Sequence, residues 1–294
     1  MAIDPKIIAT PGKKISLKNY PTAYTGKYKS KKGAEKKLEK DIKQMKKLQD
    51  MMYAHDRYSL LLIFQAMDAA GKDGTIKHVM SGVNPQGCQI FNFKKPSDEE
   101  RDHDYLWRIY KCLPERGRIG IFNRSYYEEV LITRVHPEIL LNQQLPGIDS
   151  VKKINKSFWK KRYDQMNNLE RHLHDNGTII LKFFLHVSKE EQKNRFLERI
   201  DKSEKNWKFT INDITERKFW DDYQKAFEDA INHTSTKIAP WYIIPADNKW
   251  YLRTMVGDII IKTLKSLPLH YPKVGPAKLE ELKKAKQLLL NEKK

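Results

Sequence analysis

The amino-acid sequence predicts an α/β fold with a mostly parallel, five-stranded sheet and helices on both faces. Apolar runs typical of buried strands occur near residues 60, 90, 120, 180 and 241, and helical patterns separate them. The run Leu60–Phe64 leads through a loop of small residues to Lys72 and a helix, which is the layout of a phosphate-binding loop. In such sheets ligands bind beyond the carboxyl ends of the strands, so we expect one cleft there.

Composition indicates a globular protein with a polyanionic partner. The 294 residues are 39% hydrophobic and 11% aromatic, which is enough for one large domain or two small ones. The formal net charge of +19 favours nucleic acid, an anionic membrane surface or an acidic polymer as a partner, and composition does not choose among them. A solvated, lysine-rich surface without such a partner is the alternative. No apolar signal segment opens the sequence, and no run has membrane-spanning length. Cys88 and Cys112 have neither metal-ligand nor redox spacing, so we expect a cytoplasmic protein.

The other elements follow in order along the chain. Residues 1–34 contain several prolines and glycines and are expected to be irregular. Periodicity and capping residues then predict helices over 35–52, 97–113, 150–176, 188–199, 213–231 and 248–267. The strands between them are expected over 60–64, 88–93, 118–123, 178–187 and 241–245. The Lys- and Glu-rich segment 271–294 reads as a surface helix or a tail.

The loop before Lys72 departs from the usual pattern G-x-x-x-x-G-K-[ST] at two positions. Ala66 replaces the first Gly, and Asp73 replaces the Ser or Thr that binds Mg²⁺. Asp68 and Asp73 are unfavourable beside a phosphate unless a metal bridges them, so they indicate a magnesium-dependent site. An ordinary turn into a helix is the alternative. Backbone N–H groups, the helix N-terminus and cations would bind phosphate here. The residues expected to do so are Ala70, Gly71, Lys72, Asp73, Gly74, Thr75 and Lys77.

A second set of polar residues follows the strand that ends near Asn123. Arg124 carries a guanidinium whose shape matches phosphate. Glu128 lies one helical turn further on and can reach the same metal as Asp68. Arg134 is expected to extend the basic wall of the cleft. A surface ion pair is the alternative for each of these charged residues.

Arg195 and Arg199 are expected to belong to a lid over residues 195–225. They stand at i and i+4 and therefore share a helix face, and a polar stretch containing Lys208 follows. Arginines that close over phosphates are typical of nucleotide-kinase lids, although a solvated face has the same spacing. We expect three tryptophans to be core residues rather than base-stacking platforms: Trp207, Trp220 and Trp241.

Together these motifs resemble those of the family-2 polyphosphate kinases. Met67–Thr75 is similar to the family's first motif, including its Asp after the Lys, and Phe122–Glu128 is similar to the second. The resemblance extends over residues 35–265. Asn123 and the continuation over residues 130–137 resemble the class that phosphorylates both AMP and ADP.

The resemblance implies a thymidylate-kinase-like, three-layer P-loop kinase domain over residues 35–270. It implies reversible phosphoryl transfer from inorganic polyphosphate to AMP or ADP, giving ADP and ATP. Mg²⁺, with Mn²⁺ as an alternative, would be held by Asp68 and Glu128. The protein is expected to form a homo-oligomer. It is not expected to bind nucleic acid or a membrane. The residues it marks as catalytic are Asp68, Lys72, Asn123, Arg124 and Arg195. The cations that would line the polyphosphate groove are Lys72, Arg124, Arg134, Arg195, Arg199 and Lys208.

Two functions of other kinds stay open at this point. An ATP-dependent nucleotide or small-molecule kinase with an unusual phosphate loop would transfer phosphate without polyphosphate. A non-catalytic protein that binds nucleic acid would use the basic surface alone and would not depend on Asp68. No recognisable nucleic-acid-binding module supports the second alternative.

Overall fold

A single mixed sheet organises the chain. The computed structural model describes residues 3–28 and 30–292. In the described residues six strands pair in the order β1-β6-β5-β2-β4-β3, and all pairs are parallel except β1 with β6. The prediction of an α/β fold with a mostly parallel sheet is confirmed. The strands are β1 (Ile8–Ala9), β2 (Ser59–Ala66), β3 (Cys88–Asn92), β4 (Ile119–Asn123), β5 (Thr178–His186) and β6 (Trp241–Pro245).

The central strand β2 is apolar because both of its faces are covered. Residues 59–65 are all buried, which is the pattern of an interior parallel strand. Phe64 of β2 lies opposite Asn123 of β4 and Phe183 of β5 in the sheet register. The carboxyl ends of β2, β4 and β5 therefore open at the same edge of the sheet.

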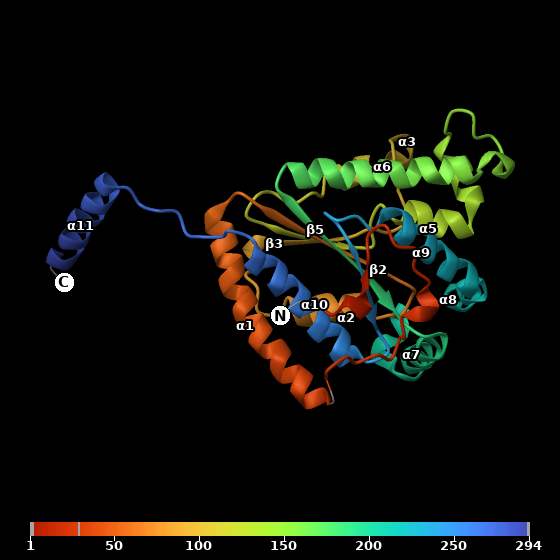
Figure 1. Ribbon diagram of the computed structural model, residues 1–294, viewed down its shortest axis with the longest axis horizontal. Helices are drawn as coiled ribbons and strands as arrows, with labels where there is room; N and C mark the ends of the chain where they lie inside the picture. Colours follow the sequence, from red (N-terminus) through yellow and green to blue (C-terminus); the bar gives the residue numbers. More distant parts are fainter. Residues whose placement is uncertain (1–2, 29, 293–294) are drawn as a thin grey trace.

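Helices cover both faces and complete three layers. Figure 1 shows α1, α2 and α10 on one side of the sheet and α5, α6 and α9 on the other. The first group comprises α1 (Lys31–His55), α2 (Lys72–Val79) and α10 (Lys249–Ser266). The second comprises α5 (Glu128–Val135), α6 (Lys156–Asp175) and α9 (Trp220–Thr234).

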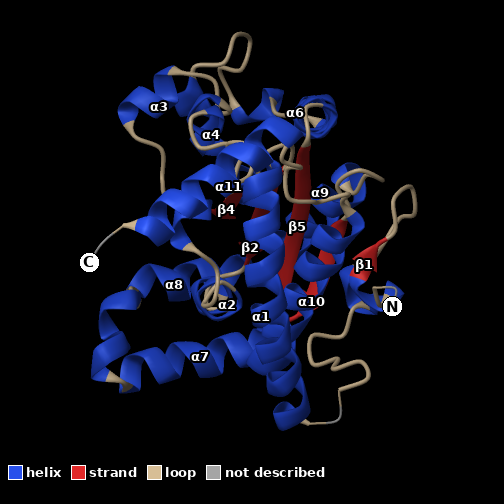
Figure 2. Cartoon of the chain, turned by 90° about the vertical axis from the view of Figure 1, so that its left-hand side faces the viewer, coloured by secondary structure: helices blue, strands red, loops and turns tan. Residues whose placement is uncertain are grey.

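The segment between β5 and α9 extends beyond the carboxyl edge of the sheet. It contains α7 (Lys189–Asp201), the 3-10 helix η6 (Ser203–Lys208) and α8 (Ile211–Glu216). Figure 2 shows α7 and α8 one above the other at the side of the molecule, away from the strands. This segment is where the sequence predicts the lid. No helix in the described part of the chain has the length and apolarity that are needed to cross a membrane.

The N-terminal extension packs against the domain, whereas the C-terminal helix does not. The N-terminal extension is not wholly irregular: β1 adds an antiparallel edge strand, and Ile7 and Leu17 are buried in the core. A two-residue strand between prolines has no periodicity, which is why the sequence does not predict it. Near the other end, α11 (Pro276–Asn291) has no buried residue and stands away from the body in Figure 1.

Several predicted helices have different bounds in the structure. The helix predicted over 213–231 is divided into α8, the 3-10 helix η7 (Arg217–Phe219) and α9, and the one predicted over 35–52 is the longer α1. The predicted helix over 97–113 is two short helices, α3 (Asp98–Asp102) and α4 (Trp107–Tyr110). The backbone turns at Asp104, whose carboxylate accepts from the N–H of Leu106. The helix predicted from residue 150 begins as α6 at residue 156, because Asn155 accepts from the first free N–H groups and caps it.

A buried ion pair crosslinks the layer of α6 to the sheet. The Lys182 ammonium, on β5, lies 2.7 Å from Glu170 of α6, and neither side chain is exposed. Glu170 also accepts hydrogen bonds from the hydroxyls of Tyr126 and Tyr127, at 2.8 and 2.7 Å. Lys182 donates further to the carbonyl of Thr234 at 2.6 Å. Both charges are thus surrounded by partners, which a buried pair requires.

We expect Glu170→Leu to lower the free energy of unfolding by about 3–5 kcal/mol, because it leaves the Lys182 ammonium buried without its carboxylate. Lys182→Met should have a similar effect for the opposite charge. The double variant should lose clearly less free energy of unfolding than the sum of the two single losses, since it leaves neither charge buried without a partner. Urea unfolding of the four proteins measures this coupling, and strict additivity would contradict it.

Candidate active site

The phosphate-binding loop joins β2 to α2 in a conformation suited to an anion. Ala69 and Gly71 have positive φ angles of 59° and 107°, so the chain curls between the strand and the helix N-terminus. The Lys72 ammonium folds back over the loop and donates to the carbonyl of Ala66 at 3.1 Å. Thr75 is buried, and its hydroxyl donates to the carbonyl of Gly71 at 2.9 Å, so it secures the first turn of α2. The loop is a cradle of backbone N–H groups with one ammonium beside it.

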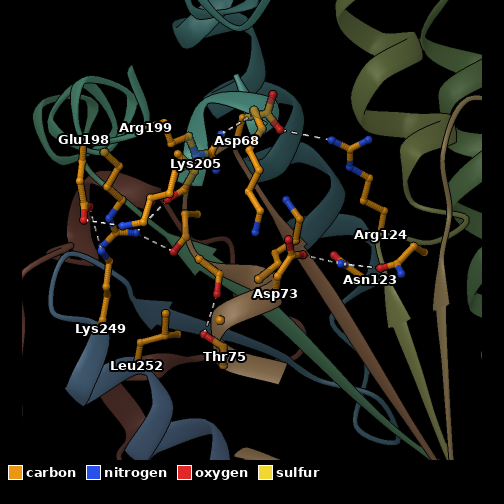
Figure 3. Close-up of a pocket in the computed structure, with 18 of the residues that line it drawn as sticks. Asp68, Asp73, Thr75, Asn123, Arg124, Glu198, Arg199, Lys205, Lys249 and Leu252 are labelled. Atoms are coloured by element: carbon orange, nitrogen blue, oxygen red, sulfur yellow. Dashed lines mark hydrogen bonds and ion pairs between the residues drawn. The ribbon is translucent and has the colours of Figure 1, made fainter. Parts of the chain in front are cut away.

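The carboxyl end of β4 lies beside this loop. Arg124 has a left-handed backbone (φ 65°), and its guanidinium lies 3.2 Å from the Asp68 carboxylate. Asn123 donates to Asp73 at 2.8 Å and to Asn92 of β3 at 2.7 Å. These contacts join the first and second motifs, as Figure 3 shows.

Two cavities meet at Asp68 and Arg124, which line both. The larger, about 720 Å³, lies over the phosphate loop and is called here the basic cavity. Among the described residues, the cations that line it are Lys72, Lys94, Arg124, Arg195, Arg199, Lys205, Lys208, Lys249 and Arg253. Its acids are Asp68, Asp73 and Glu198. The smaller, about 440 Å³, is called the acidic cavity, and its acids are Asp68, Glu128, Glu138, Asp213 and Glu216.

Burial and neighbouring charges tune the groups at this junction. Burial lowers the pKa of Lys72, and the nearby charge of Arg124 lowers it further. Burial raises the pKa of Glu128, although Arg124 and Lys72 oppose that shift. Burial also acts to lower the pKa of Arg124, but the charges of Glu128 and Asp68 outweigh it and raise the pKa. The site therefore concentrates opposite charges where solvent is partly excluded.

The lid segment brings predicted and unpredicted residues to the basic cavity. Arg199 and Lys208 line it, as do Lys205 and Trp207. The prediction that Trp207 is a core residue is wrong: its side chain is 78% exposed, and Lys208 lies over its ring. Trp220 and Trp241 are buried as predicted.

Arg195 supports the phosphate loop rather than reaching toward a ligand. It is 5% exposed, and its guanidinium donates to the carbonyls of Ala69 and Ala70 at 3.0 and 2.7 Å. Further donors reach Glu191 and the carbonyls of Ala246 and Asp247. Its donors are occupied by protein oxygens, although it also lines the basic cavity, and its closure over phosphate beside Arg199 stays a prediction.

Two other predicted phosphate ligands lie elsewhere. Arg134 lines neither cavity: its guanidinium stacks 4.8 Å from the Trp159 ring and lies 3.4 Å from Asp229. Lys77 is exposed on α2 and also lies outside both cavities. Neither side chain lines either cavity in this structure, and the binding of phosphate by either residue stays a prediction.

Three cations of the basic cavity, from α10 and the segment after β3, are not among the residues that the sequence predicts for the site. Lys249, Arg253 and Lys94 all line the basic cavity. Arg253 makes no hydrogen bond or ion pair with any residue that the structure describes, so its guanidinium is available to a ligand. The helix over 248–267 reads as an ordinary packing helix, and only its position after β6 at the carboxyl edge hints at a role.

The donor set fits a divalent metal that arrives with phosphate. Within the described residues, no group of three or more His, Cys, Asp or Glu side chains could hold a metal alone. Mg²⁺ usually takes one or two carboxylates and completes its shell with water and substrate phosphates. Asp68 and Glu128 both line the acidic cavity and supply two carboxylates of this kind.

A phosphate cradle on the central strand, with an arginine-bearing segment beside it, defines a P-loop phosphotransferase. The chain belongs to the polyphosphate kinase 2 family, whose model matches residues 28–270.

Similar proteins cover nearly the whole chain. It is 53% identical over 95% of its length to a protein of Rhodopseudomonas palustris named ADP-polyphosphate phosphotransferase, of which 96% is covered. It is 46% identical over 78% of its length to a Meiothermus ruber protein named AMP/ADP-polyphosphate phosphotransferase, of which 80% is covered. The crystal structure of polyphosphate kinase 2 from Arthrobacter aurescens superimposes with a TM-score of 0.83 at 36% identity, covering 96% of this chain and 99% of that one.

The lowered pKa of Lys72 predicts a pH dependence of anion binding. Because its pKa lies below 10.5, Lys72 loses its proton at a lower pH than an exposed lysine. We expect the affinity for tripolyphosphate, measured without metal, to begin to fall at a lower pH than an exposed lysine would cause, since only the charged ammonium attracts phosphate. Lys72→Arg should hold its affinity as the pH rises, because arginine stays charged. An equal fall in both proteins would assign the effect to another group.

Proposed function

We propose that this protein transfers the terminal phosphoryl group of inorganic polyphosphate to AMP and ADP, forming ADP and ATP. One observation carries the proposal: the basic cavity and the acidic cavity meet at Asp68 and Arg124, beside the phosphate loop. A two-substrate transfer between phosphates needs two sites that share one boundary, because donor and acceptor oxygens must lie in line.

The basic cavity suits the donor. A polyphosphate chain carries about one negative charge on each inner phosphate, and cations that line a groove attract and orient such a chain. Lys72 and the N-terminus of α2 line this cavity together with the lid cations Arg199 and Lys205. The same cavity also accounts for part of the net charge of +19.

The acidic cavity suits a nucleotide acceptor that binds together with metal. Apolar side chains of Leu131, Ile132 and Phe227 offer a surface for a base, and carboxylates surround it. These carboxylates repel free phosphate, so the acceptor's phosphates would enter with a divalent cation. Asp68 and Glu128 would hold that ion, Mg²⁺ or Mn²⁺, which when bound neutralises phosphate oxygens.

The transfer itself needs orientation and charge stabilisation. An oxygen of the acceptor's terminal phosphate forms a bond to the terminal phosphorus of the donor, and the bond from that phosphorus to its bridging oxygen breaks. The chain leaves one phosphate shorter. The attacking oxygen is already ionised, so no general base is required. Lys72 and Arg124 stabilise the negative charge on the transferred group, and Asn123 fixes Asp73 beside it.

We assign both AMP and ADP as acceptors on the motif that contains Asn123. The relative from Meiothermus ruber carries a name with both nucleotides, whereas the name of the Rhodopseudomonas palustris relative has ADP alone. Assembly into a homo-oligomer, the absence of a nucleic-acid partner and a cytoplasmic location stay predictions. The last rests on the free thiols of Cys88 and Cys112, which suit a reducing compartment.

The direct test incubates the protein with Mg²⁺, long-chain polyphosphate and either AMP or ADP, and follows the nucleotides by chromatography. We expect ADP and then ATP from AMP, and ATP from ADP. Formation of ATP from ADP, with no product from AMP, would support polyphosphate as the donor but exclude AMP as an acceptor. Transfer from ATP, with none from polyphosphate, would contradict the proposal.

Two substitutions test the residues that carry the chemistry. Asp68→Asn and Lys72→Ala should each reduce kcat by about 10³-fold or more, because each removes a charge that acts on the transferred phosphoryl group. Their melting temperatures should stay close to that of the unchanged protein, since both side chains face the cleft. Arg134→Ala is a control at a cation outside both cavities. Near-normal turnover of Lys72→Ala would refute its assignment.

A further inference from the structure

Glu198 is a carboxylate of the basic cavity that the proposed reaction leaves unexplained. Asp68 and Asp73, the other two acids of that cavity, belong to the phosphate loop. Glu198 instead lies on α7, and Figure 3 shows it on the side of the cleft opposite Arg124 and Asn123. A carboxylate placed among phosphate-binding cations repels a polyanion, so its position requires a reason.

Three lysines from three segments converge on this carboxylate. Its Oε1 accepts from Lys202, at the end of α7, at 2.8 Å, and from Lys205 of η6 at 2.7 Å. Its Oε2 lies 3.6 Å from Lys249 of α10. Hydrogen bonds from Lys202 and Lys205 lower the pKa of Glu198 to about 2, so it is ionised under all ordinary conditions.

Two of these three lysines are cavity residues. Lys205 and Lys249 line the basic cavity, whereas Lys202 does not. Glu198 therefore holds ammonium groups that would otherwise face a phosphate chain. The side chain of Glu198 is 34% exposed, and those of Lys205 and Lys249 are 36% and 46% exposed. Ion pairs with this much exposure are weak enough to exchange one anion for another.

We propose that Glu198 is an internal competitor of polyphosphate. It holds Lys205 and Lys249 when the cavity is empty, and donor phosphates displace it from both lysines when a chain enters, while Lys202 keeps it neutralised. The inference rests on the proposed function, because it takes polyphosphate as the ligand of the basic cavity.

The competition has a physical advantage for a polymeric donor. Each transfer shortens the chain by one phosphate, so the remainder must move one step toward Lys72 before the next transfer. A pathway lined by cations alone would hold the chain too tightly to advance, and conduction of charged ligands requires binding that is easily exchanged. If Glu198 re-forms its ion pairs with Lys205 and Lys249 at each step, it weakens their binding to the chain, while both cations remain in the cavity.

The test compares Glu198→Gln with Glu204→Gln by calorimetric titration of long-chain polyphosphate. Both variants change the net charge equally and lie in the lid segment, but Glu204 does not line the basic cavity, and its charge acts on Lys202, which also lies outside that cavity. We expect Glu198→Gln to bind polyphosphate about three- to tenfold more tightly than the unchanged protein, with a steeper dependence of Kd on salt. Glu204→Gln should change Kd less than twofold.

Equal or weaker binding by Glu198→Gln would overturn the inference and show that Glu198 organises the lysines for the ligand. An equal gain in both variants would also overturn it, because net charge alone would then explain the gain. In a protein that carries Lys205→Ala and Lys249→Ala, the gain from Glu198→Gln should disappear, since the competition acts through those two lysines. A gain that persists there would contradict the mechanism. Absence of polyphosphate binding by the unchanged protein would instead refute the proposed function.

Discussion

The buried pair of Lys182 and Glu170 is the constraint on which the second half of the site depends. Glu170 receives the hydroxyls of both Tyr126 and Tyr127, so the segment after β4 is fixed from beneath. Arg124 precedes these tyrosines in the chain and Glu128 follows them. The Arg124 guanidinium and the Glu128 carboxylate therefore flank the segment that the two tyrosines hold in place. Buried ion pairs add little net stability, and their better-attested contribution is to select one arrangement. Here that arrangement brings a strained arginine backbone next to the phosphate loop.

Under the proposed function, the distribution of charge separates the two substrates before any chemistry takes place. A groove rich in lysine and arginine lies beside a cavity rich in carboxylates, and of the residues that the structure describes only Asp68 and Arg124 line both. A bare polyanion is attracted to the first and repelled by the second, whereas a metal-bound nucleotide can enter the second. The backbone cradle at the N-terminus of α2 then fixes where the two meet. In this proposal, electrostatics as well as shape assigns each substrate to one cavity.

The sequence predicts those parts of the site that are local in the chain. The phosphate loop and the motif at Asn123 follow buried strands directly, so their positions follow from the sheet. Side chains whose partners are distant in sequence were not predictable: Arg134 pairs with a residue 95 positions away, and Arg195 reaches carbonyls more than 120 positions back along the chain. Helical spacing shows that Arg195 and Arg199 lie near each other, but it does not show which oxygens surround each. Arg253 is not predicted as a site residue because its helix contains no recognisable motif.

The shared boundary of the two cavities also limits how such a protein can diversify. Because Asp68 and Arg124 contact both spaces, a substitution at either alters the recognition of donor and acceptor at once. Residues that line the acidic cavity but not the basic one, such as Ile139 and Asn212, are positions where a substitution can alter the acceptor side alone. The lid cations offer the same independence on the donor side.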